Sequence, residues 1–240
     1  MHRKRHFRPQ PRDHRFLSEL ALVTLMDTTM VHQRYFPNDT TGKACQRRIR
    51  YLQNEQLIRP VEITACFGKS QAATTIHRLT VKGYAYLASL GETPPRFLKS
   101  DPKPDTLLHR LAVARSLLAF NDAVASVGLA DPSWILEQDL APGVPQDKAE
   151  VKLAERYILL EEFTLPNGEV IRCRPDMACS LTLPSTTGHG AVRLLAYWEI
   201  DRSTERHAQF LPSKLPAYYA LVRSRLYLEH WSDCPEVRNT

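Results

Sequence analysis

Apolar residues in the first ninety positions recur at helical and strand spacing and predict a small helical unit with a two-stranded hairpin. Phe16, Leu20 and Val23 follow the period of a helix. Asn38-Asp39-Thr40-Thr41 is rich in N-cap residues and opens a third helix that ends near Asn54. The other predicted elements are a first helix, a second helix, two strands and a closing helix at residues 13–26, 29–36, 57–61, 77–80 and 81–90. This order predicts a winged helix-turn-helix domain over residues 13–92.

The third predicted helix has an apolar face and a separate basic face. Cys45, Ile49 and Leu52 lie at i, i+4 and i+7, which indicates that this face packs against the core. Arginine reads guanine edges, glutamine reads adenine and lysine binds phosphate, so the other face is typical of a recognition helix. The candidate DNA contacts on this helix are Lys43, Gln46, Arg47, Arg48 and Arg50. An ordinary solvated basic face is the alternative interpretation.

Positive charge is concentrated in the front part of the chain, although the net charge of the whole is only +6. Residues 1–105 contain 18 Lys and Arg against 9 Asp and Glu, whereas the remainder contains 14 against 17. A basic segment of this kind is typical of a nucleic-acid binder, because phosphate contacts supply most non-specific affinity. Residues 1–12 are predicted to be a disordered arm. Arg3, Lys4 and Arg5 then contact phosphates or a minor groove, or else belong to a solvated tail.

The back half combines a long helix, a β-meander and a second helix, and a linker at residues 93–105 precedes it. Pro166-Asn167-Gly168 is a strong hairpin turn. The predicted elements are a helix, four strands and a final helix at residues 107–127, 134–137, 156–164, 169–181, 192–201 and from 204 onward. This order is typical of a PD-(D/E)XK, restriction-endonuclease-like domain, here over residues 106–240. The whole chain is therefore predicted to be of the α+β or α/β class.

Two acidic clusters end up on neighbouring predicted strands. Asp176 follows a proline in Arg174-Pro175-Asp176, and Glu199-Ile200-Asp201 ends an apolar strand. Neighbouring strands lie about 5 Å apart, so Asp176 and Glu199 are predicted to share one Mg2+ or Mn2+ ion. Such an ion neutralises a scissile phosphate and lowers the pKa of the attacking water. Two exposed acids on an open sheet face are the alternative interpretation.

The nuclease motif is not complete, because Asp201 stands where the motif has a lysine. Lys214 on the following helix is the candidate replacement, since it lies at the edge of that helix's predicted buried stripe. The predicted stripe is Leu211, Leu215, Tyr218 and Val222. Asp201 is a candidate ligand for a second cation or a water. The candidate catalytic residues are Asp176, Glu199, Asp201 and Lys214.

Cysteine usage and hydropathy indicate a cytoplasmic protein without a structural zinc site. The five cysteines are scattered and form no CxxC pair: Cys45, Cys66, Cys173, Cys179 and Cys234. No apolar run approaches the ~18 residues that span a bilayer, and no apolar segment follows the basic start. We therefore expect no membrane segment.

Several short motifs resemble those of the replication-relaxation proteins of bacterial plasmids. The most specific run is Glu199-Ile200-Asp201-Arg202-x-Thr204-Glu205 with Lys214-Leu215-x-x-Tyr218. The other motifs are Arg12-Asp13, Arg48-Ile49-Arg50-Tyr51-Leu52, Leu57-Ile58, Leu79-Thr80-x-x-Gly83, Leu108-His109-Arg110-Leu111 and Arg174-Pro175-Asp176. Within this group, the length and two-part layout resemble mobilisation relaxases of the MOBC type, which are similar to restriction endonucleases. The absence of a His-x-His motif from the sequence agrees with that subgroup.

The resemblance implies a protein that nicks one strand of double-stranded DNA at a plasmid origin of transfer. Its implied partners are relaxosome accessory and coupling proteins, and its implied metal ligands are Asp176 and Glu199. Two alternatives remain. One is a non-catalytic DNA-binding accessory protein or repressor with a degenerate nuclease fold, which the aspartate at position 201 favours. The other is a covalent mechanism with Tyr218 or Tyr219 as nucleophile.

Overall fold

The computed structural model describes residues 8–61, 65–67, 72–92, 101–144, 155–184, 191–200 and 207–231. The chain is a mixed α+β protein with small antiparallel sheets. It divides into two compact units, Met1–Leu118 and Ala119–Thr240. This boundary falls inside the long helix α5 (Pro104–Ser126), and part of the predicted linker lies outside the described residues. The predicted domain bounds of 13–92, 93–105 and 106–240 stay a prediction.

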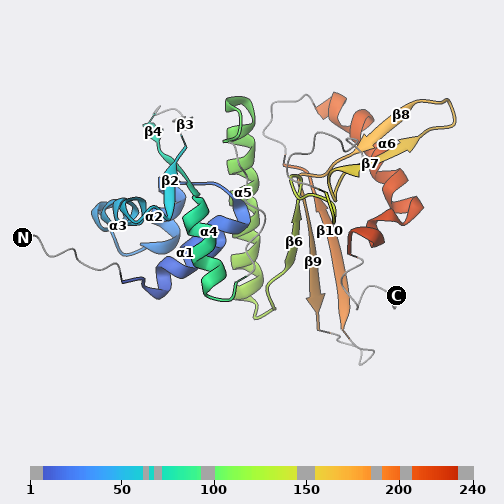
Figure 1. Cartoon of the computed structure of the whole chain (residues 1–240). Helices are drawn as coiled ribbons and strands as arrows, with labels where there is room; N and C mark the ends of the chain where they lie inside the picture. Colours follow the sequence, from blue (N-terminus) through green and yellow to red (C-terminus); the bar gives the residue numbers. More distant parts are fainter. Residues whose placement is uncertain are drawn as a thin grey trace, which may run out of the picture. The chain divides into compact units, whose positions relative to one another are not determined.

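The first unit contains each helix that the sequence predicts for it, together with three short antiparallel strand pairs. Its helices are α1 (Pro11–Val23), α2 (Thr28–Tyr35), α3 (Lys43–Asn54) and α4 (Val81–Ser89). Its strands are β1 (Met26–Asp27), β2 (Ile58–Pro60), β3 (Ala65–Phe67), β4 (Ala72–Thr74) and β5 (Ile76–Leu79). They form a sheet in the order β1-β5-β2 and a separate β3–β4 pair. Figure 1 labels β2, β3 and β4. The two-residue strand β1 and the β3–β4 pair were not predicted.

Several of the short motifs in this unit have structural roles. The Thr80 hydroxyl caps α4 by accepting a hydrogen bond from the Gly83 amide at 3.1 Å. Gly83 packs so tightly that a Cβ there would lie 2.2 Å from the carbonyl oxygen of Leu57. The carboxylate of Asp13, which is 2% exposed, accepts hydrogen bonds from the Arg48 guanidinium and so ties the start of α1 to α3. These residues fix the packing of the helices.

The second unit is built around a three-stranded antiparallel sheet and a separate hairpin. The strands are β6 (Ser133–Leu136), β7 (Glu161–Thr164), β8 (Val170–Cys173), β9 (Met177–Leu183) and β10 (Val192–Trp198). The sheet has the order β10-β9-β6, and β7 pairs only with β8. The helix α6 (His207–Ser224) packs against the β7–β8 hairpin, and the 3-10 helix η2 (Leu226–Trp231) follows it (Figure 1).

Three strand predictions in this unit were too long, and the shortest excess is that of the strand predicted over 192–201, which ends at Trp198. The predicted strand 169–181 is broken at residues 174–176, so β8 and β9 belong to different sheets. Pro175 has no N–H to donate to a ladder and restricts the backbone of the residue before it, which is consistent with a break at this point. The predicted strand 156–164 is extended only from Glu161 onward, because residues 155–159 form turns and a bridge.

The central strand β9 is buried along its first five residues. One core cluster contains Ala178 with Ile135, Leu159 and Trp231, and a second contains Cys173 with Ala217 and Leu221. The ring of Phe120 in α5 lies edge-on to the ring of Trp198, with 5.1 Å between the ring centres. Within the described part of the chain, no helix is long and apolar enough to cross a membrane.

Candidate functional site

Asp176 and Glu199 meet at one end of the β9–β10 ladder. Trp198 lies opposite Met177, and one further step in the same antiparallel register places Glu199 opposite Asp176. The amide of Asp176 donates to the Trp198 carbonyl at 3.0 Å, and its Oδ2 accepts from the Ile200 amide at 2.6 Å. Asp176 is 8% exposed, and its hydrogen bond from the Ile200 amide holds the chain in place just after β10. The register therefore places both acids at the same end of the ladder, and their sharing of one cation stays a prediction.

Glu199 is held by two side chains from α6. Its Oε2 lies 2.7 Å from Lys214 Nζ, and its Oε1 accepts a hydrogen bond from the Tyr218 hydroxyl at 2.7 Å. Lys214 and Tyr218 are four residues apart, so they project from the same side of the helix. The side chain of Glu199 is 15% exposed, which strengthens its attraction to the ammonium group. Lys214 therefore does reach the acidic site from the following helix.

The buried face of α6 differs from the predicted stripe. Leu215 and Val222 are 61% and 63% exposed, whereas Ala217 and Leu221 are each 1% exposed and pack beside Cys173. The prediction that Leu215 and Val222 are buried is therefore wrong; the side chain of Leu211 is outside the described part. The helix lies close against the β7–β8 hairpin, and Ala217, which is smaller than Leu215 and Val222, faces that hairpin. Both Pro212 and Pro216 lie inside the helix.

The electrostatic environment of the site keeps its neighbouring groups protonated. Burial, followed by the hydrogen bond to Glu199, raises the pKa of Tyr218 well above its usual value. Burial, with the charges of Glu199 and Glu161, raises the pKa of the Cys173 thiol to about 12. Both groups are therefore neutral at physiological pH, and the charged group that contacts Glu199 directly is the Lys214 ammonium.

The donor chemistry of the site fits a hard divalent cation. Asp176 and Glu199 supply carboxylate oxygens, which Mg2+ and Mn2+ prefer as ligands. A carboxylate oxygen has more than one lone pair, so Glu199 can accept from Lys214 and still bind a cation. Within the described residues, no three His, Cys, Asp or Glu side chains come together as a metal site. Asp201, the third predicted acid, lies outside these residues.

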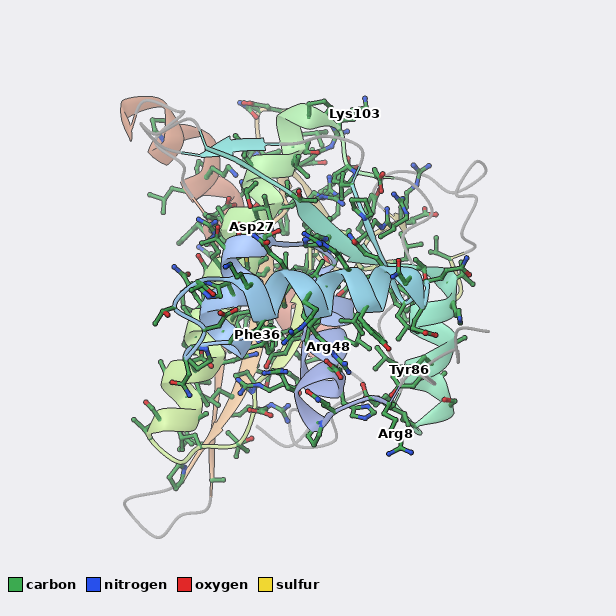
Figure 2. The ribbon with its side chains drawn as sticks, turned by 90° about the vertical axis from the view of Figure 1, so that its left-hand side faces the viewer. Arg8, Asp27, Phe36, Arg48, Tyr86 and Lys103 are labelled. Atoms are coloured by element: carbon green, nitrogen blue, oxygen red, sulfur yellow. The ribbon has the colours of Figure 1, made fainter. Side chains whose placement is uncertain are left out.

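The basic face of α3 is exposed, with one exception. Lys43, Gln46, Arg47 and Arg50 are exposed, while Cys45, Ile49 and Leu52 are buried. Arg48 is only 17% exposed and pairs with Asp13, which raises the pKa of its guanidinium through their hydrogen bond. Figure 2 shows Arg48 on the side of α3 that faces α1. Arg3, Lys4 and Arg5 lie outside the described residues.

The second unit also contains a hydrogen-bonded series of three polar side chains, Tyr197, His230 and Glu161, which was not predicted. Tyr197 Oη lies 2.9 Å from Nδ1 of His230, and Nε2 of His230 lies 2.9 Å from Oε1 of Glu161. Glu161 is the register partner of Cys173 across the β7–β8 hairpin. These residues are far apart in sequence, so no local spacing signals their contact. For the Glu199 site, the i, i+4 spacing of Lys214 and Tyr218 is a local signal that could have linked Tyr218 to Lys214.

Comparison with known families gives one match. The family model described as Replication-relaxation matches residues 17–237, which includes most of both compact units. No curated protein and no solved structure has a significant match to the chain.

Proposed function

This chain belongs to the replication-relaxation family, and we propose that it is a site-specific, metal-dependent DNA-nicking protein of the MOBC relaxase type. Membership of the family supports a role in plasmid replication or mobilisation. The observation that carries the finer proposal is the placement of Asp176 opposite Glu199, with Lys214 on the second acid. Its proposed substrate is double-stranded DNA at an origin of transfer, where relaxosome accessory and coupling proteins would assemble with it.

The first unit is proposed to find the DNA site as a winged helix-turn-helix domain. Support comes from the order of α1 to α4 and the strands between α3 and α4, and from the exposed basic side chains on α3. Lys43, Arg47 and Arg50 would contact phosphates or base edges. Arg48 is left out of the proposed contact face, because its guanidinium is already engaged by Asp13.

The second unit is proposed to cut the DNA as a PD-(D/E)XK domain. Asp176 and Glu199 would hold the metal, which supplies positive charge beside the scissile phosphate and makes water more acidic. Lys214 is close enough to Glu199 to place a second positive charge at the same phosphate, where negative charge develops during cleavage. The ion pair keeps the Lys214 side chain in one position before DNA arrives.

Water is a better nucleophile than tyrosine in this arrangement. A tyrosine nucleophile requires a phenolate or a base ready to take its proton, and the raised pKa of Tyr218 opposes the phenolate. Tyr219 is 61% exposed and donates no hydrogen bond to an acid in the described residues; instead it accepts one from Arg223 at 3.2 Å. The proposal is therefore hydrolytic nicking.

The test is conversion of supercoiled plasmid carrying the cognate origin to open circles in the presence of Mg2+ or Mn2+. We expect wild-type protein to nick and Asp176→Ala to lose nicking by at least a hundredfold, because a metal ligand is removed. Glu169→Gln is the matched control, since Glu169 is an exposed acid in the turn between β7 and β8. Open-circle product that survives Asp176→Ala at the wild-type rate would refute the assignment.

A second candidate function is a non-catalytic DNA-binding accessory protein of the same family. It is favoured by the fact that both carboxylate oxygens of Glu199 already have partners, Lys214 and Tyr218. In this second candidate function, the ion pair between Lys214 and Glu199 has a structural role alone, which is to hold α6 in place. Calorimetric titration with Mn2+ separates the two candidate functions. A metal-dependent nickase should give a binding heat that is lost in Glu199→Gln, whereas a protein with a purely structural ion pair should give no such heat.

A further inference from the structure

The outward face of α6 carries large apolar side chains that the described part of the chain leaves open. Leu215, Tyr219 and Val222 are 61%, 61% and 63% exposed, and their i, i+4, i+7 spacing places them in one stripe. Lys214, which contacts Glu199, lies about 100° around the helix from Leu215 and so flanks this stripe. One helix therefore connects the candidate cutting site to an exposed apolar stripe.

A guanidinium group lies beside the aromatic ring in this stripe. Arg223 Nη1 donates to the Tyr219 hydroxyl at 3.2 Å, and its guanidinium carbon lies 5.8 Å from the centre of the Tyr219 ring. The sequence of residues 207–224 contains no Asp or Glu, so no acid of this helix opposes a polyanion. An exposed tyrosine with a neighbouring arginine is the chemistry that binds a base by stacking and its phosphate by charge.

We propose that the outward face of α6, centred on Tyr219 and Arg223, binds single-stranded DNA. A base stacks on the Tyr219 ring, Leu215 and Val222 contact the neighbouring base or sugar, and Arg223 neutralises a phosphate. The ligand is single-stranded because base faces are covered in a duplex and open only in an unpaired strand. We take the natural ligand to be the DNA strand next to the nick, and in this respect the inference rests on the proposed function.

Charge decides between DNA and a second copy of the chain as the occupant of this face. A symmetric dimer through α6 would place two helices that contain no Asp or Glu against each other, so neither helix would offer an acid to the Arg223 of its partner. A DNA strand brings negative charge to the same surface. The face is therefore complementary to a polyanion and not to itself.

The test is fluorescence anisotropy with a labelled, mixed-sequence 20-nucleotide single strand, in EDTA and with excess unlabelled duplex to occupy the first unit. Tyr219→Ala is expected to weaken single-strand binding by about 5- to 150-fold, because one stacked base contributes ~1–3 kcal/mol. Tyr219→Phe keeps the ring and should bind within about twofold of wild type. Arg223→Gln should weaken binding and lower its salt dependence.

Arg172→Gln is the matched control, because Arg172 is an exposed arginine that pairs with Glu162 on the hairpin. The inference is overturned if Tyr219→Ala binds single strands like wild type, or if it loses no more affinity than Arg172→Gln. It is also overturned if Tyr219→Ala changes the oligomeric state in sedimentation while single-strand affinity is unchanged. The assay needs no cleavage, so wild-type protein that binds single strands through Tyr219 but never nicks refutes the proposed nuclease function and not this one.

Discussion

At the scale of single residues, His77 shows how burial sets a charge state in this fold. His77 is 2% exposed, and its Nε2 contacts the Thr28 hydroxyl at 2.9 Å. Among the described residues, its Nδ1 has no hydrogen-bond partner. Burial lowers the pKa of His77 to about 4, although the charge of Asp27 acts in the opposite direction. The folded protein therefore keeps this imidazole neutral at pH values where the unfolded chain binds a proton.

This difference predicts acid sensitivity of the fold. Because the pKa is lower in the folded state, stability is present above pH 6.5 and is lost as the pH falls toward 4. The loss from this one group reaches about 2 kcal/mol at pH 5. Denaturant unfolding at pH 7 and pH 5 measures it, and His77→Gln is expected to reduce the difference between the two pH values. Equal pH dependence in the wild type and in a folded His77→Gln variant would contradict the prediction.

Gly83 shows a different constraint, which is space. A Cβ at this position would lie 2.2 Å from the Leu57 carbonyl oxygen and 2.9 Å from a methyl group of Leu79. Gly83→Ala should therefore lower the free energy of unfolding by at least ~1–3 kcal/mol, since backbone would have to move. Thermal unfolding measures this effect. Lys82→Ala, at an exposed position of the same helix, is the control and should be nearly neutral.

At the scale of secondary-structure elements, α6 matters most because its orientation sets up the site. Its inward side carries Ala217 and Leu221 against the hairpin, and this packing turns Lys214 and Tyr218 toward Glu199. The same rotation leaves Tyr219 on the outward side. Packing of one helix thus determines both the ion pair and the exposed stripe.

Two consecutive residues of α6 test this orientation. Leu221→Ala should cost about 2–5 kcal/mol of stability, because Leu221 is 1% exposed and truncation leaves a cavity. Val222→Ala should change stability by less than about 0.5 kcal/mol, because Val222 is 63% exposed. Urea unfolding of the two variants gives the comparison. The opposite ranking would mean that the originally predicted stripe, with Val222 buried, is the right one.

At the scale of the whole molecule, the two compact units carry separate chemistry. The exposed cations of α3 belong to the first unit, and the Asp176–Glu199 pair belongs to the second. A defect in one unit should therefore leave the property of the other unchanged, which is the expectation for sites without shared contacts.

The prediction is a clean separation of binding from nicking. The triple variant Lys43→Ala, Arg47→Ala, Arg50→Ala should weaken origin binding and lower the slope of log K against log salt by about 1 for each lost phosphate contact. Its Mn2+ binding heat should match the wild type. Glu199→Ala should abolish nicking while origin affinity stays within a few-fold. Normal origin binding by the triple variant would refute the recognition-helix assignment and direct attention to the basic arm at residues 1–12.

The sequence by itself determined those features that depend on local spacing. The helices over Pro11–Val23 and Lys43–Asn54 follow from apolar period, and so does the burial of Cys45, Ile49 and Leu52. The position of Asp176 just before β9 and of Glu199 just after β10, at the same end of the ladder, follows from two neighbouring antiparallel strands. Each of these inferences needs only the residues of one segment, or of two segments that pair.

Tertiary structure alone decided which apolar side chains are buried and which polar side chains pair with each other. Leu215 and Val222 are as apolar as Leu221, so nothing local shows that Ala217 and Leu221 are the residues facing the hairpin. Arg48 resembles its exposed neighbours on α3 until Asp13, which is 35 residues away, binds it. A side chain's chemistry is local, but the group that neutralises or buries it comes from a distant segment, and folding is what brings that segment to it.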